Sequence, residues 1–242
     1  MEKLKVLDLF SGIGGFSLGL ERTGGFETVA FCEIDPYCRA VLRKHWPHVP
    51  QFEDVTKLNG SDIGRADVIC GGFPCQDISD AGRRVGIEGE RSGLWRDFAR
   101  LIGELRPRFA IEENVAALNF RGLGRVLGDL TAIGYDAEWH VIPARLLGAP
   151  HERERCWIIA YPEGFSRLYQ SDIGQEAQRL LAYSPPWQAC PWNAPEACVC
   201  RVDDGIPDRV VRTEKPGNAV IPFIPEIIGR AILNNQSNRE GA

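Results

Sequence analysis

The sequence predicts an α/β fold in which helices cover a mainly parallel β-sheet. Short apolar runs alternate regularly with longer segments whose apolar residues recur at helical spacing, which is the pattern of this class. The composition, 44% hydrophobic and 25% charged, is that of an ordinary globular protein. A length of 242 residues allows one sizeable core with a small appendage.

The apolar runs predict the strands, and the periodic segments between them predict the helices. We expect strands near Lys5–Phe10, Thr28–Glu33, Asp67–Gly71, Phe109–Glu113, Glu138–Ile142 and Cys156–Tyr161, with a short further strand before Asp54. We expect helices near Gly14–Arg22, Pro36–His45, Leu94–Leu105, Leu123–Ile133 and Ala219–Leu233.

The texture of the chain changes after the last predicted strand, which suggests a division into four parts. A main domain is expected over residues 1–162. The segment 163–215 is polar and then rich in Pro, Trp and Cys, as in a linker or small insert. Residues 216–234 are expected to pack back on the main domain as a helix, and 235–242 to form a flexible tail.

Charge and cysteine usage limit the class of protein. The net charge of -5 does not favour coating of nucleic acid by bulk electrostatics, so any DNA contact must be local. The first residues are too short an apolar run for a signal peptide or membrane span, which predicts a cytoplasmic protein with reduced cysteines. Cys190, Cys198 and Cys200 lack the close pair typical of zinc sites, so we expect no metal.

A glycine-rich turn follows the first predicted strand. Residues 10–16 read Phe-Ser-Gly-Ile-Gly-Gly-Phe and then open a helix. Glycines at such a turn let a ligand approach the backbone, and the helix N-terminus offers unpaired N–H groups. A nucleotide-like cofactor fits there, but strand–turn–helix junctions also use glycine for packing alone. The motif by itself leaves both interpretations open.

Acidic residues follow the second and third strands. Glu33 ends the second strand, where ribose-binding acids lie in dinucleotide-binding folds. Its alternative role is to cap the helix that starts at Pro36, although Asp35 is better placed as that cap. Asp54 has the chemistry to accept a hydrogen bond from an adenine amino group.

A thiol and a carboxyl group are expected at the same sheet edge. Cys75 lies in Gly71-Gly72-Phe73-Pro74-Cys75-Gln76, beyond the carboxyl end of a buried strand, where open α/β sheets bind ligands. Glu113 ends the next long strand. A thiol nucleophile beside a proton-donating carboxyl group suits attack on an electron-poor ring. Taken alone, a cysteine is usually a small buried hydrophobe and a glutamate often caps a helix.

Two arginines enter the strand near Cys156–Tyr161. Arg153 and Arg155 are two residues apart, so strand alternation places them on one face. One guanidinium there has the geometry to hold a pyrimidine carbonyl oxygen or a phosphate. The alternative is a pair of salt bridges with Glu152 and Glu154.

Taken in order, these stretches resemble the DNA cytosine-5 methyltransferases of bacteria and phages. The matching stretches are Asp8-Leu9-Phe10-Ser11-Gly12-Ile13-Gly14-Gly15, Glu33, Asp54, Gly72-Phe73-Pro74-Cys75-Gln76, Glu113-Asn114-Val115, Arg153-Glu154-Arg155 and Gly217-Asn218-Ala219-Val220. They span residues 4–161 and 216–233. Their joint, ordered occurrence outweighs the alternatives that each motif allows alone.

The resemblance implies a fold, a cofactor and the residues that bind it. The fold is the Rossmann-like mixed sheet of S-adenosylmethionine-dependent methyltransferases, with helices on both faces and one antiparallel strand near Cys156–Tyr161. Glu33 would hold the ribose of S-adenosylmethionine, Asp54 and Val55 its adenine, and Asn218 would close the pocket. The other cofactor-binding residues that it implies are Phe10, Gly12, Gly14, Gly15, Ile34 and Pro74.

The implied activity is methyl transfer to carbon 5 of a cytosine flipped out of double-stranded DNA. The Cys75 thiolate would add to carbon 6 while Glu113 donates a hydrogen bond or proton to ring nitrogen 3. Arg153 or Arg155 would help to hold the base, and the loop 77–93 would close over it. Carbon 5 would then take up the methyl group, and loss of its proton and of the thiolate would release the product.

Two departures from the family pattern bear on recognition. His151 stands where many members have Gln, and the target recognition region is limited to the short stretch 163–215. Recognition is therefore either short or dependent on a partner, and a cognate restriction endonuclease is a further expected partner. Two alternatives stay open: methylation of RNA cytosine by the same machinery, and an inactive DNA-binding relative.

Overall fold

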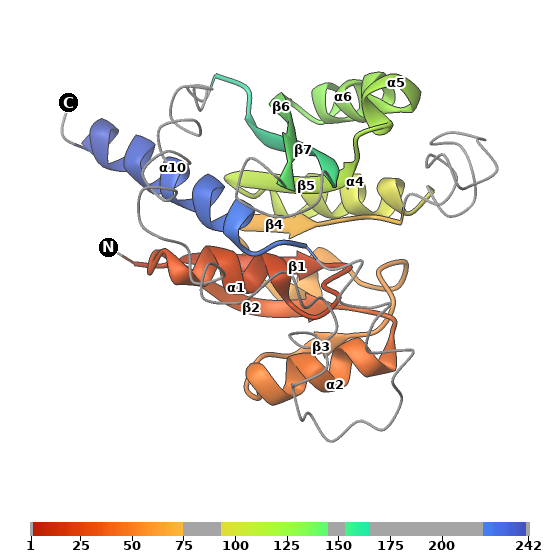
Figure 1. The fold of residues 1–242 in the computed structure, drawn as a ribbon, viewed down its shortest axis with the longest axis vertical. Helices are drawn as coiled ribbons and strands as arrows, with labels where there is room; N and C mark the ends of the chain where they lie inside the picture. The colour runs from red at the N-terminus through yellow and green to blue at the C-terminus, as the bar shows by residue number, and fades with distance from the viewer. Residues whose placement is uncertain (1, 75–92, 145–152, 165–219, 241–242) are drawn as a thin grey trace, which may run out of the picture.

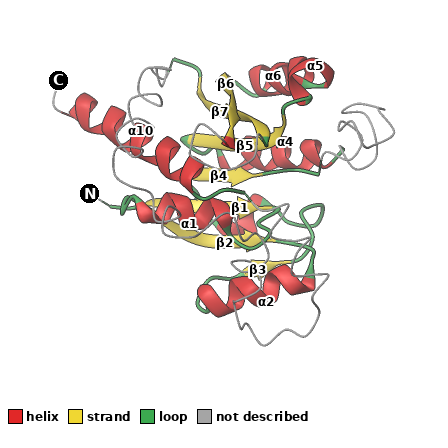
Figure 2. Cartoon of the chain, viewed as in Figure 1, coloured by secondary structure: helices red, strands yellow, loops and turns green. Residues whose placement is uncertain are grey.

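A seven-stranded sheet forms the centre of the molecule, in the order β3-β2-β1-β4-β5-β7-β6. The computed structural model describes residues 2–74, 93–144, 153–164 and 220–240. The strands are β1 (Leu4–Leu9), β2 (Phe26–Cys32), β3 (Gln51–Phe52), β4 (Val68–Gly71), β5 (Phe109–Val115), β6 (Tyr135–Pro143) and β7 (Glu154–Pro162). Figures 1 and 2 show β3 near one end of this arrangement and β6 near the other.

The helices of the described residues agree closely with those predicted. They are α1 (Gly15–Arg22), α2 (Pro36–His45), α3 (Gly60–Ile63), α4 (Leu94–Leu105), α5 (Leu118–Arg121), α6 (Leu123–Ala132) and α10 (Phe223–Glu240). The bounds of α2 match the prediction because its start is encoded locally: the Asp35 side chain accepts from the N–H groups of Tyr37 and Cys38, and Pro36 opens the helix. The short helices α3 and α5 were not predicted, since four residues carry no periodic signal.

The sheet is parallel from β3 to β5 and contains one antiparallel strand. β7 pairs in the antiparallel direction with β5 on one side and with β6 on the other. The expected α/β fold with an antiparallel strand near Cys156–Tyr161 is therefore confirmed. β6 is longer than predicted, because it pairs with β7 from Tyr135 to Pro143. The sequence did not indicate this length, since polar residues alternate along the strand and weaken its apolar signal.

Helices cover both faces of the sheet, and a separate hydrophobic core lies on each face. One core joins the strands to α4 and α6, with Phe98 and Val126 fully buried. The other joins them to α1 and α10, with Leu20 and Ile228 fully buried. Because helices cover both faces of the sheet, the edge at the carboxyl ends of the parallel strands stays open for polar side chains.

The C-terminal segment packs back on α1, as the sequence predicts, and α10 lies alongside it (Figure 1). A Cβ added to Gly15 would lie 2.5 Å from the carbonyl oxygen of Val220. A Cβ added to Gly19 would lie 2.0 Å from the carbonyl oxygen of Pro222. These two positions on α1 carry no side chain, and the returning backbone occupies that space.

The last helix extends further than expected. α10 begins at Phe223 and continues to Glu240, whereas the sequence predicts an end at Leu233 and a flexible tail over 235–242. The helix includes residues 235–240, where no Gly or Pro interrupts the chain, and the flexibility expected of this tail stays a prediction. The predicted insert lies almost wholly outside the described residues, so the division at residues 162 and 215 stays a prediction. Within the described ranges, no helix is long and apolar enough to cross a membrane.

Candidate active site

The glycine-rich turn between β1 and α1 has an unusual backbone. Phe10, Gly12 and Gly14 have φ angles of 51°, 53° and 87°, all in the left-handed region. Glycine adopts this region freely, whereas a phenylalanine there is strained, as residues at functional sites often are. The turn is held by Gly14 N–H, which donates to the Ser11 carbonyl at 2.9 Å, and by Ser11 Oγ, which donates to the Asp8 carbonyl at 2.6 Å.

Glu33 lies against this turn at the end of β2. Its Oε2 accepts from Gly12 N–H at 2.7 Å, and its Oε1 accepts from Asp35 N–H at 2.8 Å. Asp35, and not Glu33, caps α2, as the sequence suggests. Each Glu33 oxygen has one backbone donor and keeps further acceptor capacity. The carboxylate is therefore fixed in orientation and still able to accept from hydroxyl groups.

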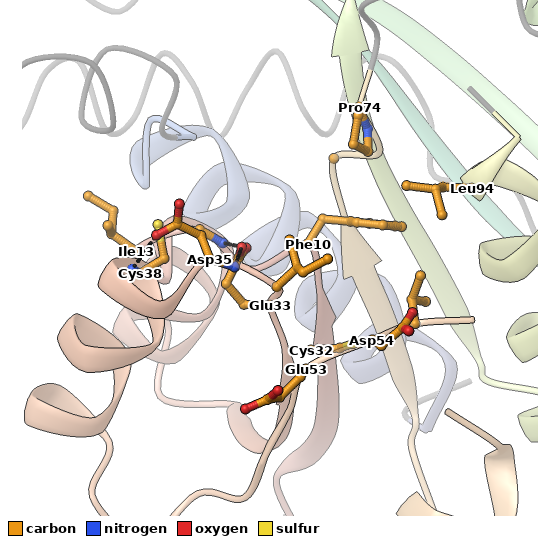
Figure 3. A pocket seen from close by; sticks show the side chains of 14 residues that line it. Phe10, Ile13, Cys32, Glu33, Asp35, Cys38, Glu53, Asp54, Pro74 and Leu94 are labelled. Carbon is orange, nitrogen blue, oxygen red and sulfur yellow. Dashed lines mark hydrogen bonds between the residues drawn. The ribbon is translucent and has the colours of Figure 1, made fainter. Parts of the chain in front are cut away.

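A pocket of about 300 Å³ opens beside the turn, and Figure 3 shows Pro74 and Leu94 on one side of it with Ile13 and Cys38 on the other. Its lining includes most of the residues that the resemblance assigns to the cofactor: Phe10, Gly12, Glu33, Ile34, Asp54, Val55 and Pro74. The remaining lining residues are Ile13, Cys32, Asp35, Cys38, Glu53, Gly72 and Leu94. The volume falls at the lower end of the range of small-molecule sites.

Two predicted cofactor glycines lie behind the pocket and not in its lining. Gly14 faces the Trp46 ring, and Gly15 faces Val220. Conversely, sequence reasoning missed Cys38 and Leu94. Cys38 is buried on α2 one turn after the Asp35 cap, so the helix period itself could have placed it on the inner face. Leu94 carries no such signal, because it is the first residue of α4 and follows no earlier turn of that helix.

Asp54 and Ile34 both line the pocket, but Asp54 is held by hydrogen bonds whereas Ile34 is largely exposed. Asp54 Oδ1 accepts from Thr56 N–H at 3.0 Å and from Thr56 Oγ1 at 2.7 Å, and these hydrogen bonds lower the pKa of the carboxyl group. Lys57 Nζ lies 3.2 Å from Asp54 Oδ2. Ile34 is 75% exposed, which leaves a large apolar side chain at the pocket rim.

These residues fit a nucleoside-type cofactor such as S-adenosylmethionine. The Glu33 carboxylate is oriented by two backbone donors, as a ribose ligand should be. The exposed Ile34 side chain provides an apolar surface for a flat ring, and Asp54 provides an ionised acceptor beside it. A Cβ added to Gly12 would meet no atom within 4 Å, so the turn leaves open space on this side.

A second cluster lies at the same sheet edge, around Glu113 on β5. The Nε of Arg155, on β7, lies 2.8 Å from Glu113 Oε1. A Cβ added to Gly72, just after β4, would lie 2.8 Å from Glu113 Oε2, so the missing side chain lets the carboxyl group approach the backbone. Burial raises the pKa of Glu113, whereas the charges of Arg155 and Arg153 lower it. The net shift of the pKa is upward, so the carboxyl group keeps its proton to a higher pH than an ordinary glutamate does.

Arg153 and Arg155 interact electrostatically with Glu113, and Glu113 is a more important partner for them than the acidic residues next to them in sequence. Arg155 Nη1 donates to the backbone carbonyl of Glu154, but its ion pair is with Glu113. Arg153 contributes to the electrostatic field at Glu113 as well. The predicted common face of the two arginines agrees with this arrangement. Glu152, the other partner in the salt-bridge alternative, lies outside the described residues.

The residues beside Glu113 connect this cluster to the strand that leads to Cys75. Asn114 Nδ2 donates to the Phe73 carbonyl at 3.3 Å, which ties β5 to the chain just before Pro74. Cys75 itself, the loop 77–93 and Asn218 fall outside the described residues, apart from Gly93. Glu112 points into the opposite core, where burial raises its pKa well above the ordinary value. Among the described residues, neither of its oxygens has a hydrogen-bond partner.

Comparison with known proteins places these features in one family. The family model of the C-5 cytosine-specific DNA methylases matches residues 4–183. The type II methyltransferase M2.BsuMI of Bacillus subtilis is 38% identical over 165 residues, which cover 65% of this chain and 42% of that protein. The type II methyltransferase M.NgoBV of Neisseria gonorrhoeae is 34% identical over 209 residues, covering 79% of this chain and 49% of that protein.

A solved structure supports the same relationship. A prophage-encoded protein of E. coli, assigned as a DNA modification methyltransferase, superposes with a TM-score of 0.55 at 30% identity, covering 66% of this chain and 47% of the other. The Dnmt2 methyltransferase of S. pombe superposes with a TM-score of 0.61 at 20% identity, which supports the fold. The chain thus spans less than half the length of M2.BsuMI, M.NgoBV and the prophage protein.

Proposed function

Because the chain belongs to the C-5 cytosine-specific DNA methylase family, we propose that it methylates carbon 5 of cytosine in double-stranded DNA. The observation that carries the proposal is the pairing of Glu113 with Arg155 beside Gly72. This pair places a carboxyl group with a raised pKa near the carboxyl end of β5, next to β4, the strand that leads to Cys75. The neighbouring pocket has the residues of a nucleoside site.

We assign the cofactor site to that pocket, with S-adenosylmethionine as its occupant. Glu33 would accept from the ribose hydroxyls, while Ile34, Asp54 and Val55 would surround the adenine. Phe10, Gly12 and Pro74 would line the rest of the site, which the buried glycines Gly14 and Gly15 support from behind. Asn218 would close it from the C-terminal segment. When bound, S-adenosylmethionine supplies the electrophilic methyl group that carbon 5 takes up.

The protein residues would prepare the cytosine for this transfer. The target base must leave the duplex, since its ring is unreachable while stacked. The Cys75 thiolate adds to carbon 6, and the electron pair of the carbon 5–carbon 6 double bond moves toward carbon 5. After methylation, loss of the proton from carbon 5 restores the double bond and expels the thiolate. The loop 77–93 would exclude water during these steps.

Glu113 would donate its proton, or a hydrogen bond, to ring nitrogen 3 of the cytosine. Protonation at that nitrogen draws electrons from carbon 6 and makes it a better target for the thiolate. The raised pKa of Glu113 supports this role, because a carboxyl group can donate only while it holds a proton. Arg155 and Arg153 would orient Glu113 and help to hold the base.

A trapping experiment tests the proposal directly. The full chain is incubated with S-adenosylmethionine and a duplex in which 5-fluorocytosine replaces the target cytosine. Fluorine at carbon 5 cannot leave as a proton does, so an active thiolate should remain covalently attached to the DNA. A denaturation-resistant complex at Cys75, identified by mass spectrometry of the peptide, is the expected result. Failure to trap with saturating cofactor, across a duplex library, would favour the inactive relative.

The substrate and partners are further proposals. Parallel assays on duplex DNA and transfer RNA separate DNA methylation from RNA methylation. The residues 163–215 would form the target recognition region, alone or with a partner, as the sequence suggests. The names of those relatives favour a restriction-modification setting with a cognate endonuclease. The cytoplasmic location expected from the sequence stays a prediction.

A further inference from the structure

Trp46 packs directly behind the glycine-rich turn. A Cβ added to Gly14 would lie 2.7 Å from Cζ3 and 2.8 Å from Cη2 of the Trp46 ring. The backbone of Gly14, at φ 87°, therefore rests on the outer edge of the indole. Trp46 is not among the residues that line the pocket. It supports the turn from the side away from the pocket.

The opposite end of the indole is fixed by a hydrogen bond. Trp46 Nε1 donates to Glu21 Oε2 at 2.9 Å, and Glu21 Oε1 accepts from Thr28 N–H at 3.0 Å. Glu21 belongs to the last turn of α1, whereas Gly14 is the N-cap of the same helix. The indole thus connects both ends of α1, and Glu21 extends the connection to β2.

The indole also contacts the strand that carries Glu33. The rings of Phe31 and Trp46 are 5.3 Å apart in an edge-to-face arrangement, and Phe31 lies two residues before Glu33. The same side of α2 carries Cys38, which lines the pocket, and Leu42, whose Cδ2 would lie 3.0 Å from a Gly14 Cβ. Residues 38, 42 and 46 therefore lie on one side of α2 and pack against the glycine-rich turn and the end of β2.

We propose that Trp46 is a positioning residue for S-adenosylmethionine, acting through Gly14 and Phe31 without touching the cofactor. This inference rests on the proposed function. The turn has three left-handed residues, and Gly14 has no side chain with which to resist a shift of its backbone. A rigid aromatic edge against Gly14 limits that shift. The hydrogen bond to Glu21 keeps the edge in place.

The test measures cofactor affinity on folded protein. Calorimetric titration with S-adenosylhomocysteine, well below the unfolding temperature, compares the full wild-type chain with Trp46→Leu. The dissociation constant should rise about tenfold or more, since misplacing a binding group by a fraction of an ångström is costly. Methyl transfer should show a raised KM for S-adenosylmethionine, with kcat at saturating cofactor and KM for DNA unchanged.

Two further variants keep the test decisive if Trp46→Leu folds poorly. Trp46→Phe retains an aromatic ring, so most of the affinity should return. Glu21→Ala removes the acceptor of the indole N–H, so a smaller loss of affinity is expected. An unchanged dissociation constant for both Trp46→Leu and Glu21→Ala, or for Glu21→Ala alone where the former is unfolded, would overturn the inference.

Controls separate positioning from general loss of stability. Trp139, on β6, is 45% exposed, so Trp139→Leu should leave affinity unchanged. Val126 is fully buried on α6, and Val126→Ala should lower the unfolding temperature without changing affinity. If Val126→Ala weakened binding as much as Trp46→Leu did, the effect would be unspecific and the inference wrong. A wild-type chain that bound no S-adenosylhomocysteine would refute the proposed function and this inference with it.

Discussion

The Nε of Arg155 lies 2.8 Å from Oε1 of Glu113, and this contact opposes the effect of burial on the Glu113 carboxyl group. Burial raises the pKa of Glu113, while the charge of Arg155 lowers it. The two side chains come from β5 and β7, which are neighbours in the sheet although about forty residues separate them in sequence. The proton affinity of the proposed acid is therefore set by strand pairing.

Removing Arg155 should change the pH dependence of methyl transfer. Without its charge, the pKa of Glu113 rises further, so the high-pH limb of the kcat/KM profile should move to higher pH in Arg155→Met. The rate at the optimum should fall by roughly 100-fold, because a charged donor near the base is lost. Arg125→Met, which removes an ion pair to Asp129 on α6, should change neither quantity. A limb that stays in place would exclude Glu113 as the titrating group.

Substitution of Cys75 and of Glu33 should affect different steps. Cys75→Ala should abolish methyl transfer while leaving S-adenosylhomocysteine affinity unchanged, because the thiol acts on the base. Glu33→Ala should weaken cofactor binding first. The ribose hydroxyls would lose their proposed acceptor, which corresponds to about 2 kcal/mol or roughly 30-fold in Kd. Calorimetry and a transfer assay on the same preparations separate the two effects. Turnover retained by Cys75→Ala would show that the covalent scheme is wrong.

The contact between α1 and the C-terminal segment predicts a stability effect at Gly19. A methyl group there would meet the Pro222 carbonyl at 2.0 Å, so Gly19→Ala should lower the free energy of unfolding by about 1–3 kcal/mol. The matched control is Gly128→Ala in α6, where a Cβ meets no atom within 4 Å. That change should stabilise the helix by up to about 1 kcal/mol. Denaturant unfolding of both variants measures the difference, and equal values would contradict the packing.

The buried carboxyl group of Asp8 should make the free energy of unfolding depend on pH. Burial raises its pKa from 3.8 to about 8, against the hydrogen bonds from Ser17. The folded state keeps this proton up to about pH 8, whereas the unfolded chain releases it near pH 3.8, so the free energy of unfolding falls as the pH rises between these values. Asp8→Asn should make that fall less steep.

Glu112→Gln should act in the same direction as Asp8→Asn, because burial raises the pKa of Glu112 as well. Chemical denaturation at several pH values between about 4 and 8 provides the measurement. If both variants kept the wild-type slope, these two carboxyl groups would not be the cause of the pH dependence.

The sequence by itself determined the features that depend on neighbouring residues. The start of α2 followed from Asp35 and Pro36, which act on the first turn of their own helix. The apolar runs located the long strands, because burial on both faces requires a continuous apolar segment. The ordered motifs also indicated the family, since their spacing is a property of the chain and not of its packing.

Only the tertiary structure decided which groups meet across the sheet. Two arginines in sequence were equivalent candidates, but the pairing of β5 with β7 brings Arg155 into contact with Glu113. Gly14 and Gly15 looked like ligand-binding glycines, yet Trp46 and Val220 occupy the space beside them. Glu112 and Glu113 are adjacent on β5, but only Glu113 meets an arginine, because β7 brings Arg155 to its side of the sheet. Each of these outcomes depends on contacts between distant segments, which local propensity and spacing do not encode.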